Sequence, residues 1–325
     1  MPDTHINQYK YMKHNFFIAA ALVIAATACT KKQLQPAIGG EEEMAELTVS
    51  VPQISTRASG VSDANVKNFQ VFIFQDDKLE ATAEGTTAPQ TLKLTKGVKK
   101  VAVLANHQKI NDVSTYAELK ARPFDLAVNA PDALLMFGED TLHLSGNRSD
   151  TVDVSRLTAR VELQKITNAL ELEAYKGLKM TLKRVYLINA VGERTVAGEY
   201  ENAKWYNLGK FVSGDCNGLL LEEAERQIQS EGSVLNYCFY TYPNSGSSSP
   251  VRLVAEIAIG SDIWYYPVTI PDVLANTRYI VSNLKITRIG VDDPDQVIDY
   301  ANSGVSIEVK PWEDINVGEV IILLL

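Results

Sequence analysis

Apolar and polar positions alternate with a period of two along most of the chain from Leu47 onward, in short runs rich in β-branched and aromatic residues. This alternation predicts β-strands that bury one face. The principal runs are residues 47–51, 69–74, 92–105, 152–163, 179–188, 251–259, 263–270, 279–286 and 305–309. Clusters of Gly, Asn, Asp and Pro separate the runs, and short strands at this spacing predict an all-β fold of sandwich type.

Helical signal is thin, and only residues 115–120 and 219–228 are predicted as short helices. The chain beyond residue 28 is long for one sandwich and comfortable for two. A polar stretch at 145–150 interrupts the strand pattern. We therefore predict two tandem sandwiches of the transthyretin or immunoglobulin-like type, at residues 58–155 and 156–312.

Residues 1–28 have the pattern of a secretion signal. Lys13 precedes an apolar run at 16–26, and small residues lead to Cys29. That run is too short to span a bilayer as a helix, whereas a charged start, an apolar stretch and small residues before a cut are typical of a signal peptide. Cys29 stands where a lipoprotein signal carries its acylated cysteine, although Ala26 replaces the usual leucine. The alternative is an ordinary signal peptide with an incidental cysteine.

The net charge limits the classes of binding partner, and the cysteine content limits the disulfides that the chain can form. The net charge is −9 and the pI about 5.1, so no nucleic-acid partner is expected, because such a partner requires a basic face. Besides Cys29, the chain has Cys216 and Cys238. They either pair in an oxidising compartment or remain small buried thiols, since spacing alone does not give geometry.

No residue pattern predicts catalysis or a cofactor. His107 and His143 lack metal-ligand spacing, no serine has a nucleophile-elbow glycine pattern, and no Gly-rich phosphate loop follows a strand. The segment 292–295, with three aspartates, offers too few oxygen ligands for calcium and is interpreted as a solvated turn. The aromatic residues 239–242 and 264–266 are interpreted as ordinary strand residues rather than a sugar-stacking platform. We expect no catalytic residue, metal or cofactor, and we predict that the protein is not an enzyme.

Three further features of the sequence are interpreted together. A polar tether and a strand occupy residues 29–54. Arg57 follows in the small, polar stretch 55–60, where a protease can bind the chain without disturbing a core. Residues 320–325 are all apolar, with no charged side chain after Glu319. An exposed strand of that kind pairs readily with another chain.

The sequence resembles the fimbrillin (FimA-like, type V pilus) subunits of Bacteroidales over most of the chain after Cys29. The order of the motifs carries the resemblance more than any one of them. They are the lipobox ending at Cys29, Thr56-Arg57-Ala58, residues 66–74, 101–106 and 156–163, and Trp312 followed by a terminal strand.

The resemblance implies a lipoprotein precursor anchored at the outer membrane through Cys29 and cleaved by an arginine-specific protease between Arg57 and Ala58. Residues 29–57 form the propeptide, and its strand is displaced by residues 313–325 of an identical or related subunit, in a head-to-tail polymer at the cell surface. The implied core-facing residues of the displaced strand are Leu47, Val49 and Val51. The implied donor-strand residues are Val317, Val320, Ile322 and Leu324, although the opposite phase, Ile321, Leu323 and Leu325, is equally apolar and the register stays open.

This combination favours a stalk subunit that supports adhesion. The alternative is a non-polymerising cell-surface lipoprotein, which is an anchor or tip fimbrial subunit or a glycan- or host-binding adhesin. Neither the host or bacterial receptor nor the position in a fibre follows from the sequence.

Overall fold

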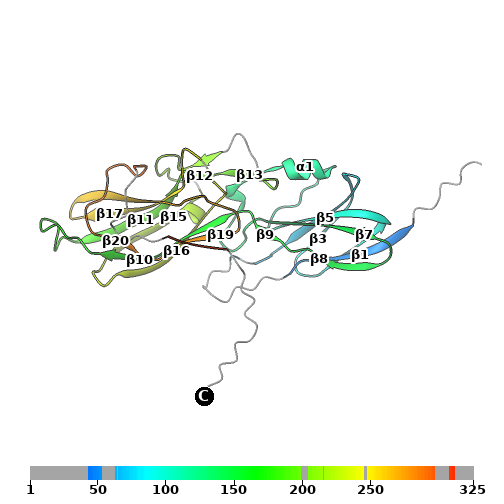
Figure 1. Ribbon diagram of the computed structural model, residues 1–325, viewed down its shortest axis with the longest axis horizontal. Helices are drawn as coiled ribbons and strands as arrows, with labels where there is room; N and C mark the ends of the chain where they lie inside the picture. Colours follow the sequence, from blue (N-terminus) through cyan, green and yellow to red (C-terminus); the bar gives the residue numbers. More distant parts are fainter. Residues whose placement is uncertain are drawn as a thin grey trace, which may run out of the picture. The chain divides into compact units, whose positions relative to one another are not determined.

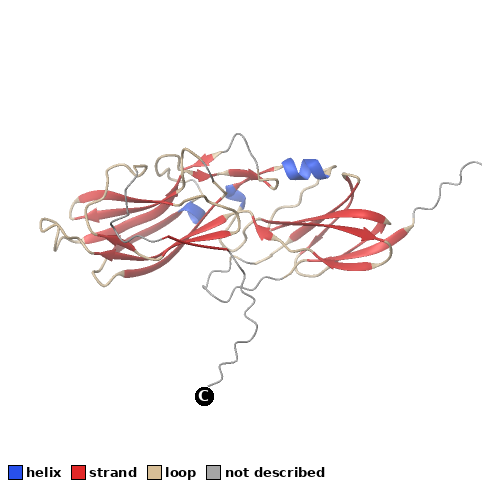
Figure 2. Cartoon of the chain, viewed as in Figure 1, coloured by secondary structure: helices blue, strands red, loops and turns tan. Residues whose placement is uncertain are grey.

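The computed structural model describes residues 43–52, 63, 65–198, 204–214, 216–244 and 247–296, and the backbone of 307–311. All of these residues belong to one compact unit that begins at Glu42. Strands dominate this part of the chain, as Figure 2 shows. The all-β fold of packed sheets predicted from the sequence is confirmed. Among the described residues, no helix has the length and apolar character needed to cross a membrane.

The first half of the described chain forms two sheets around one apolar cluster. The three-stranded sheet has the order β4 (Gln90–Thr95), β1 (Met44–Ser50), β8 (Arg148–Thr151). The five-stranded sheet has the order β3 (Lys78–Gly85), β2 (Phe69–Gln75), β5 (Gly97–Ala105), β7 (Met136–Leu144), β9 (Ser155–Arg156). Side chains of both sheets meet in this cluster, including Leu47, Leu94, Ile73, Val103 and Leu142. This is the layering of a β-sandwich.

The second half repeats this arrangement with different strands. One sheet has the order β16 (Ser233–Thr241), β10 (Ala159–Asn168), β19 (Thr277–Val281), β21 (Ile307–Pro311), and β20 (Leu284–Ile286) also pairs with β10. The other sheet has the order β15 (Leu221–Gln227), β11 (Met180–Ile188), β17 (Arg252–Ile259), β18 (Asp262–Thr269). Both sheets contribute buried side chains to one larger cluster, which continues to Phe72 and Leu104 on the other face of β2 and β5. The division into separate domains at residue 155 stays a prediction.

Short elements join these sheets. The two-stranded pairs are β6 (Pro123–Asp125) with β13 (Glu193–Thr195), and β12 (Ala190–Val191) with β14 (Trp205–Tyr206). The helices are α1 (Tyr116–Ala121), α2 (Asn217–Leu220) and the 3-10 turn Leu126–Val128. Helix α1 confirms the predicted helix at 115–120: Thr115 caps it, and Glu118 completes a capping box, which satisfies donors at the helix start.

The predicted helix at 219–228 is wrong. Only its first two residues belong to α2, and residues 221–227 form strand β15, which pairs with β11 from Thr181↔Gln227 to Tyr186↔Leu221. The residues of β15 are good helix formers, but the edge of the second sandwich supplies backbone partners over the whole segment. Tertiary pairing therefore overrides local propensity.

Candidate functional site

Strand β1 is the middle strand of its sheet. It pairs antiparallel with β4, from Met44↔Thr95 to Val49↔Gln90, and parallel with β8, from Leu47↔Arg148 to Ser50↔Thr151. Figure 1 shows β1 and β8 side by side. Because β4 and β8 are joined in this sheet only through β1, loss of this strand leaves an unpaired edge on both sides of a gap.

The inward face of β1 is apolar and closed to solvent. Leu47 and Val49 are fully buried and Ala45 is 4% exposed, and Val51, the first residue after the strand, continues this face at 7% exposed. Alternation explains this arrangement, since every second side chain of a strand points to the same face. The sequence correctly places Leu47, Val49 and Val51 against a core, while their displacement stays a prediction.

The outward face of β1 makes only a few polar contacts. The Thr48 and Thr91 hydroxyls lie 2.8 Å apart, and Ser50 Oγ lies 2.9 Å from Thr151 Oγ1. At the start of the strand, the Glu46 N–H donates to Asn147 Oδ1 at 2.9 Å. Exposed contacts of this kind contribute little each. The backbone ladders and the buried face therefore hold β1 in place.

A buried charge cluster fixes the chain downstream of β1. Asp63 is 1% exposed, and its carboxylate forms an ion pair with Arg160, which is 3% exposed. The backbone carbonyl oxygen of Asp63 accepts a hydrogen bond from Arg156 Nε at 3.1 Å. Arg160 Nε also lies 3.0 Å from Glu162. We call Asp63, Arg156, Arg160 and Glu162 the downstream clamp.

Opposing effects act on the guanidinium in this clamp. Burial lowers the pKa of Arg160, but its charged and polarisable neighbours, Cys238, Glu162 and Asp63, raise it above the usual value. Arg160 is therefore a fixed positive charge, and the segment after β1 is attached to β10 through it. Sequence reasoning missed this cluster, although charged residues that alternate with apolar ones at the start of a strand, as Arg160 and Glu162 do with Ala159, Val161 and Leu163, are a signal of buried pairing.

The other predicted site residues lie outside the described part of the chain. They are the lipidation residue Cys29, the cleavage residues Arg57 and Ala58, and the donor residues Val317, Val320, Ile322 and Leu324. β21, paired with β19 from Thr277↔Pro311 to Val281↔Ile307, is the last described element before the predicted donor segment.

The described residues hold no cluster of His, Cys, Asp or Glu that would bind a metal. Cys216 and Cys238 are not joined by a disulfide bond. Asp295 in the acidic turn accepts from Asn189 at 2.9 Å and forms an ion pair with Arg252, so this carboxylate neutralises a cation of the protein itself.

The aromatic runs belong mainly to the core of the second sandwich. Phe239, Tyr240, Tyr242 and Tyr266 are all at most 4% exposed. Their burial agrees with the interpretation as strand residues, because side chains that stack on a sugar must be accessible.

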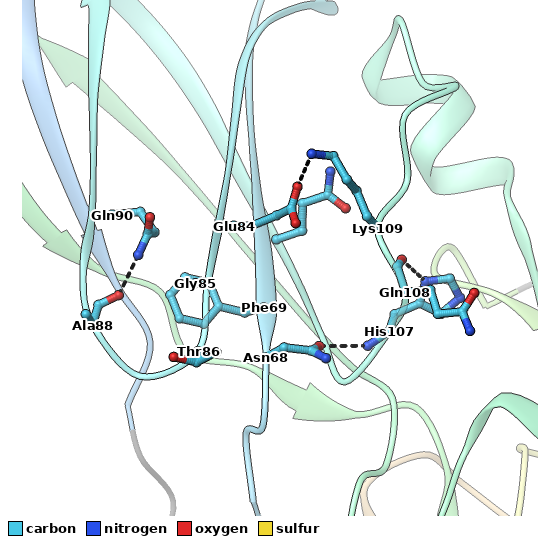
Figure 3. Close-up of a pocket in the computed structure, with 11 residues that line it drawn as sticks. Asn68, Phe69, Glu84, Gly85, Thr86, Ala88, Gln90, His107, Gln108 and Lys109 are labelled. Carbon is cyan, nitrogen blue, oxygen red and sulfur yellow. Dashed lines mark hydrogen bonds and ion pairs between the residues drawn. The ribbon is translucent and has the colours of Figure 1, made fainter.

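An open hollow of about 580 Å³ lies at the exposed edge of the five-stranded sheet, beside β3 (Figure 3). The His107 N–H donates to Asn68 Oδ1 at 3.2 Å, and Lys109 forms an ion pair with Glu84. Burial lowers the pKa of His107, which favours the neutral ring. These polar groups bond within the protein and need no ligand to satisfy them. The hollow is lined by Asn68, Phe69, Gln70, Glu84, Gly85, Thr86, Ala88, Gln90, His107, Gln108 and Lys109.

Comparison with known proteins points to one family. Residues 45–170 match the sequence model of the major fimbrial subunit protein (FimA). This region contains β1, both sheets of the first sandwich and the start of the second. No curated protein matches the sequence.

Solved structures share the fold over most of the chain. A candidate cell adhesion protein from Bacteroides eggerthii superposes with a TM-score of 0.65 at 20% identity, covering 83% of this chain and 96% of that one. Another from Parabacteroides distasonis gives 0.59 at 17% identity, with 83% and 100% covered.

The fimbrilin (FimA) of Porphyromonas gingivalis gives a TM-score of 0.58 at 15% identity, covering 82% of this chain and 97% of that one. At these identities the likeness establishes a shared fold. Together with the match of residues 45–170 to the major fimbrial subunit family, it confirms the resemblance to fimbrillins.

Proposed function

We propose that this chain is a structural stalk subunit of a fimbrium. It is exported as a lipoprotein and cleaved after Arg57. It polymerises when residues 313–325 of one copy replace β1 of the next. The observation that supports this most directly is the middle position of β1 between β4 and β8. A strand from another chain can take that place by β-strand addition.

The burial of β1 sets the energetic scale of the exchange. Three or four inward side chains at about 1.5–3 kcal/mol each correspond to roughly 5–10 kcal/mol of apolar burial. Loss of the strand also leaves backbone groups of β4 and β8 without partners. A cleaved subunit therefore retains β1 noncovalently until an equally apolar strand displaces it. Cleavage gives the exchange a direction, because the severed strand can leave.

The downstream clamp is suited to such a cut. Asp63 follows Arg57 by six residues and is held by Arg156 and Arg160. A cut at Arg57 lies between β1 and this attachment. The released piece would therefore contain β1, while the remaining chain stays bound to the fold.

The contact joins two different surfaces, the gap left by β1 and the segment 313–325. Such a heterologous contact repeats head to tail and gives an open filament. In this proposal the precursor is held at the outer membrane through acylated Cys29, and the product is part of a cell-surface appendage. Its role is mechanical and adhesive, with no cofactor and no reaction of its own.

The test is cleavage of the purified precursor with an arginine-specific protease, followed by mass spectrometry and unheated SDS gels. We expect one cut after Arg57 and a ladder of multimers. R57A should block both, and deletion of residues 315–325 should allow the cut but abolish the ladder. R122A is the matched control, because Arg122 bonds a surface carboxylate, Asp112, away from β1, and it should behave like the unchanged protein.

Resistance of Arg57 to the protease, or a cleaved protein that stays monomeric, would contradict the stalk assignment. The protein would then be a non-polymerising anchor or tip subunit, or a surface adhesin.

A further inference from the structure

The inward positions of β1 differ in size along the strand. The first, Ala45, is small and 4% exposed, and it lies opposite the buried Leu94 of β4. The next three, Leu47, Val49 and Val51, are large, and 7% is the highest exposure among them. The gap left by β1 therefore has a narrow first position followed by three wide ones.

The donor segment contains one set of alternate residues with the same order of sizes. Gly318 is followed two positions later by Val320, and then by Ile322 and Leu324. Relative to β1, Gly318 and Val320 each have one carbon fewer than Ala45 and Leu47. Ile322 and Leu324 each have one more than Val49 and Val51. The total number of side-chain carbons is unchanged, and cores tolerate changes that conserve volume.

We infer the register of the incoming strand, and this inference rests on the strand replacement proposed above. Gly318 takes the place of Ala45, and the next three inward residues, Val320, Ile322 and Leu324, take the places of Leu47, Val49 and Val51. In this register the incoming strand keeps the direction of β1, which is antiparallel to β4 and parallel to β8.

Glu319 argues against the opposite phase, in which residues 319, 321, 323 and 325 would face inward. Placing Ile321, Leu323 and Leu325 in the wide positions puts Glu319 at the position of Ala45. A carboxylate is larger than the methyl group it replaces, and burying it without a partner is costly. Shifting this phase by two residues in one direction moves Glu319 to the position of Leu47, which is fully buried. The shift in the other direction puts Ile321 at the narrow position of Ala45, which overfills it.

Shifts within the inferred phase fit less well. A shift by two residues in one direction puts Val320 at the position of Ala45, which overfills it. The other direction puts Gly318 at the position of Leu47, which leaves a cavity. The outward residues do not discriminate between phases, because both phases leave large aliphatic side chains on that face. Gly318 and the site of Ala45 are therefore the residues that determine the register.

Disulfide cross-linking tests this register directly. In the inferred register Ile321 takes the place of Thr48, whose hydroxyl lies 2.8 Å from that of Thr91. Cysteines at two such positions can form an interchain disulfide. After cleavage and oxidation, T91C/I321C should give multimers that survive heating without reductant and fall to monomers with it.

The matched variant is T91C/I322C, because the opposite phase would place residue 322 across from Thr91. A one-residue slip turns a side chain to the other face, so we expect at least about tenfold less cross-linked product from this pair. T91C alone measures any cross-linking through the native thiols Cys216 and Cys238.

Gly318 gives a second, independent measurement. G318A reproduces the side chain of Ala45 and should assemble within about twofold of the unchanged rate. G318V overfills the narrow position and should slow assembly by about tenfold or more. Equal assembly of both variants would show that residue 318 faces outward, which overturns the register.

The outcomes separate the two proposals. Cross-linking through residue 322, or multimers that form without cross-links in either pair, would overturn the register and leave strand replacement standing. Absence of multimers from the cleaved, unchanged protein would instead overturn strand replacement and the register with it.

Discussion

Substitution of Leu47 by alanine separates the stability of the precursor from that of the fibre. Leu47 is fully buried in the cluster between the two sheets of the first sandwich. If β1 leaves on assembly, the side chain matters only before cleavage. We expect L47A to destabilise the precursor and to leave the mature fibre unchanged.

The structure sets the size of this effect. Leucine to alanine removes three carbons, or about 2.4 kcal/mol at roughly 0.8 kcal/mol per buried carbon. Leu47 lies between two paired strands that cannot easily close over the space, so a cavity contribution is expected, within the range of about 2–5 kcal/mol for such substitutions. We therefore expect a loss of about 3 kcal/mol in the free energy of unfolding of the precursor.

The assay is denaturant unfolding of the precursor and of fibres assembled from it. The control is I73A. Ile73 is fully buried on β2 in the same cluster but remains in the cleaved chain, so it should destabilise both forms by a similar amount. Fibres from L47A and unchanged precursor should have the same midpoint at equal concentration, because the cleaved chains are identical. A lower midpoint for L47A fibres would show that β1 remains bound and would refute strand replacement.

Three further substitutions test other features. D63N removes the ion pair with buried Arg160 and should lower the free energy of unfolding by about 3 kcal/mol; an unchanged denaturation midpoint would contradict the clamp. Burial raises the pKa of Glu80, but the hydrogen bonds from Lys99 and Thr95, together with the charge of Lys99, outweigh it and hold the pKa of this carboxyl below its usual value. The stability from this pair is therefore present above pH 4.5 and lost as pH falls through the lower folded value. E80Q should cost about 2 kcal/mol at pH 7, because the fully buried Lys99 side chain loses its carboxylate partner and keeps only the neutral Gln75 and Thr95. This cost should shrink in unfolding curves measured below pH 4. A Cβ at Gly138 would overlap the backbone of Asp153 in the same chain, so G138A should lower the thermal midpoint of precursor and fibre alike. An unchanged midpoint would show that the backbone shifts freely there.

Local pattern was enough to predict most strands, since alternation is a property of a few adjacent residues. Local pattern failed for strands whose packing or pairing partners are distant in the sequence. Residues 69–74 were expected to bury one face, yet all six are buried, because Phe72 and Phe74 pack into the larger cluster with Leu119 of α1. Strand β15 was predicted as a helix for the same reason: its partner β11 is distant in sequence.

Local sequence pattern likewise predicts one part of the candidate site and not the other. The inward phase of Leu47 and Val49 follows from alternation alone, but the position of β1 between β4 and β8 depends on pairings across the chain. The ion pair of Asp63 with Arg160 joins residues 97 positions apart. No period in the sequence encodes such a contact, and only the folded chain reveals it.

The pairing of β1 also bears on how the protein folds. Ser50 contacts residues on β8 about a hundred positions later, whereas β2 and β3 are joined by the two-residue turn Asp76-Asp77. Contacts of high sequence separation form slowly, because loop-closure entropy opposes them. We therefore expect β1 to dock after the transition state, with φ-values near zero. Docking of this strand would then complete a nucleus formed by β2, β3, β5 and β7. Its later departure would leave the folding nucleus intact.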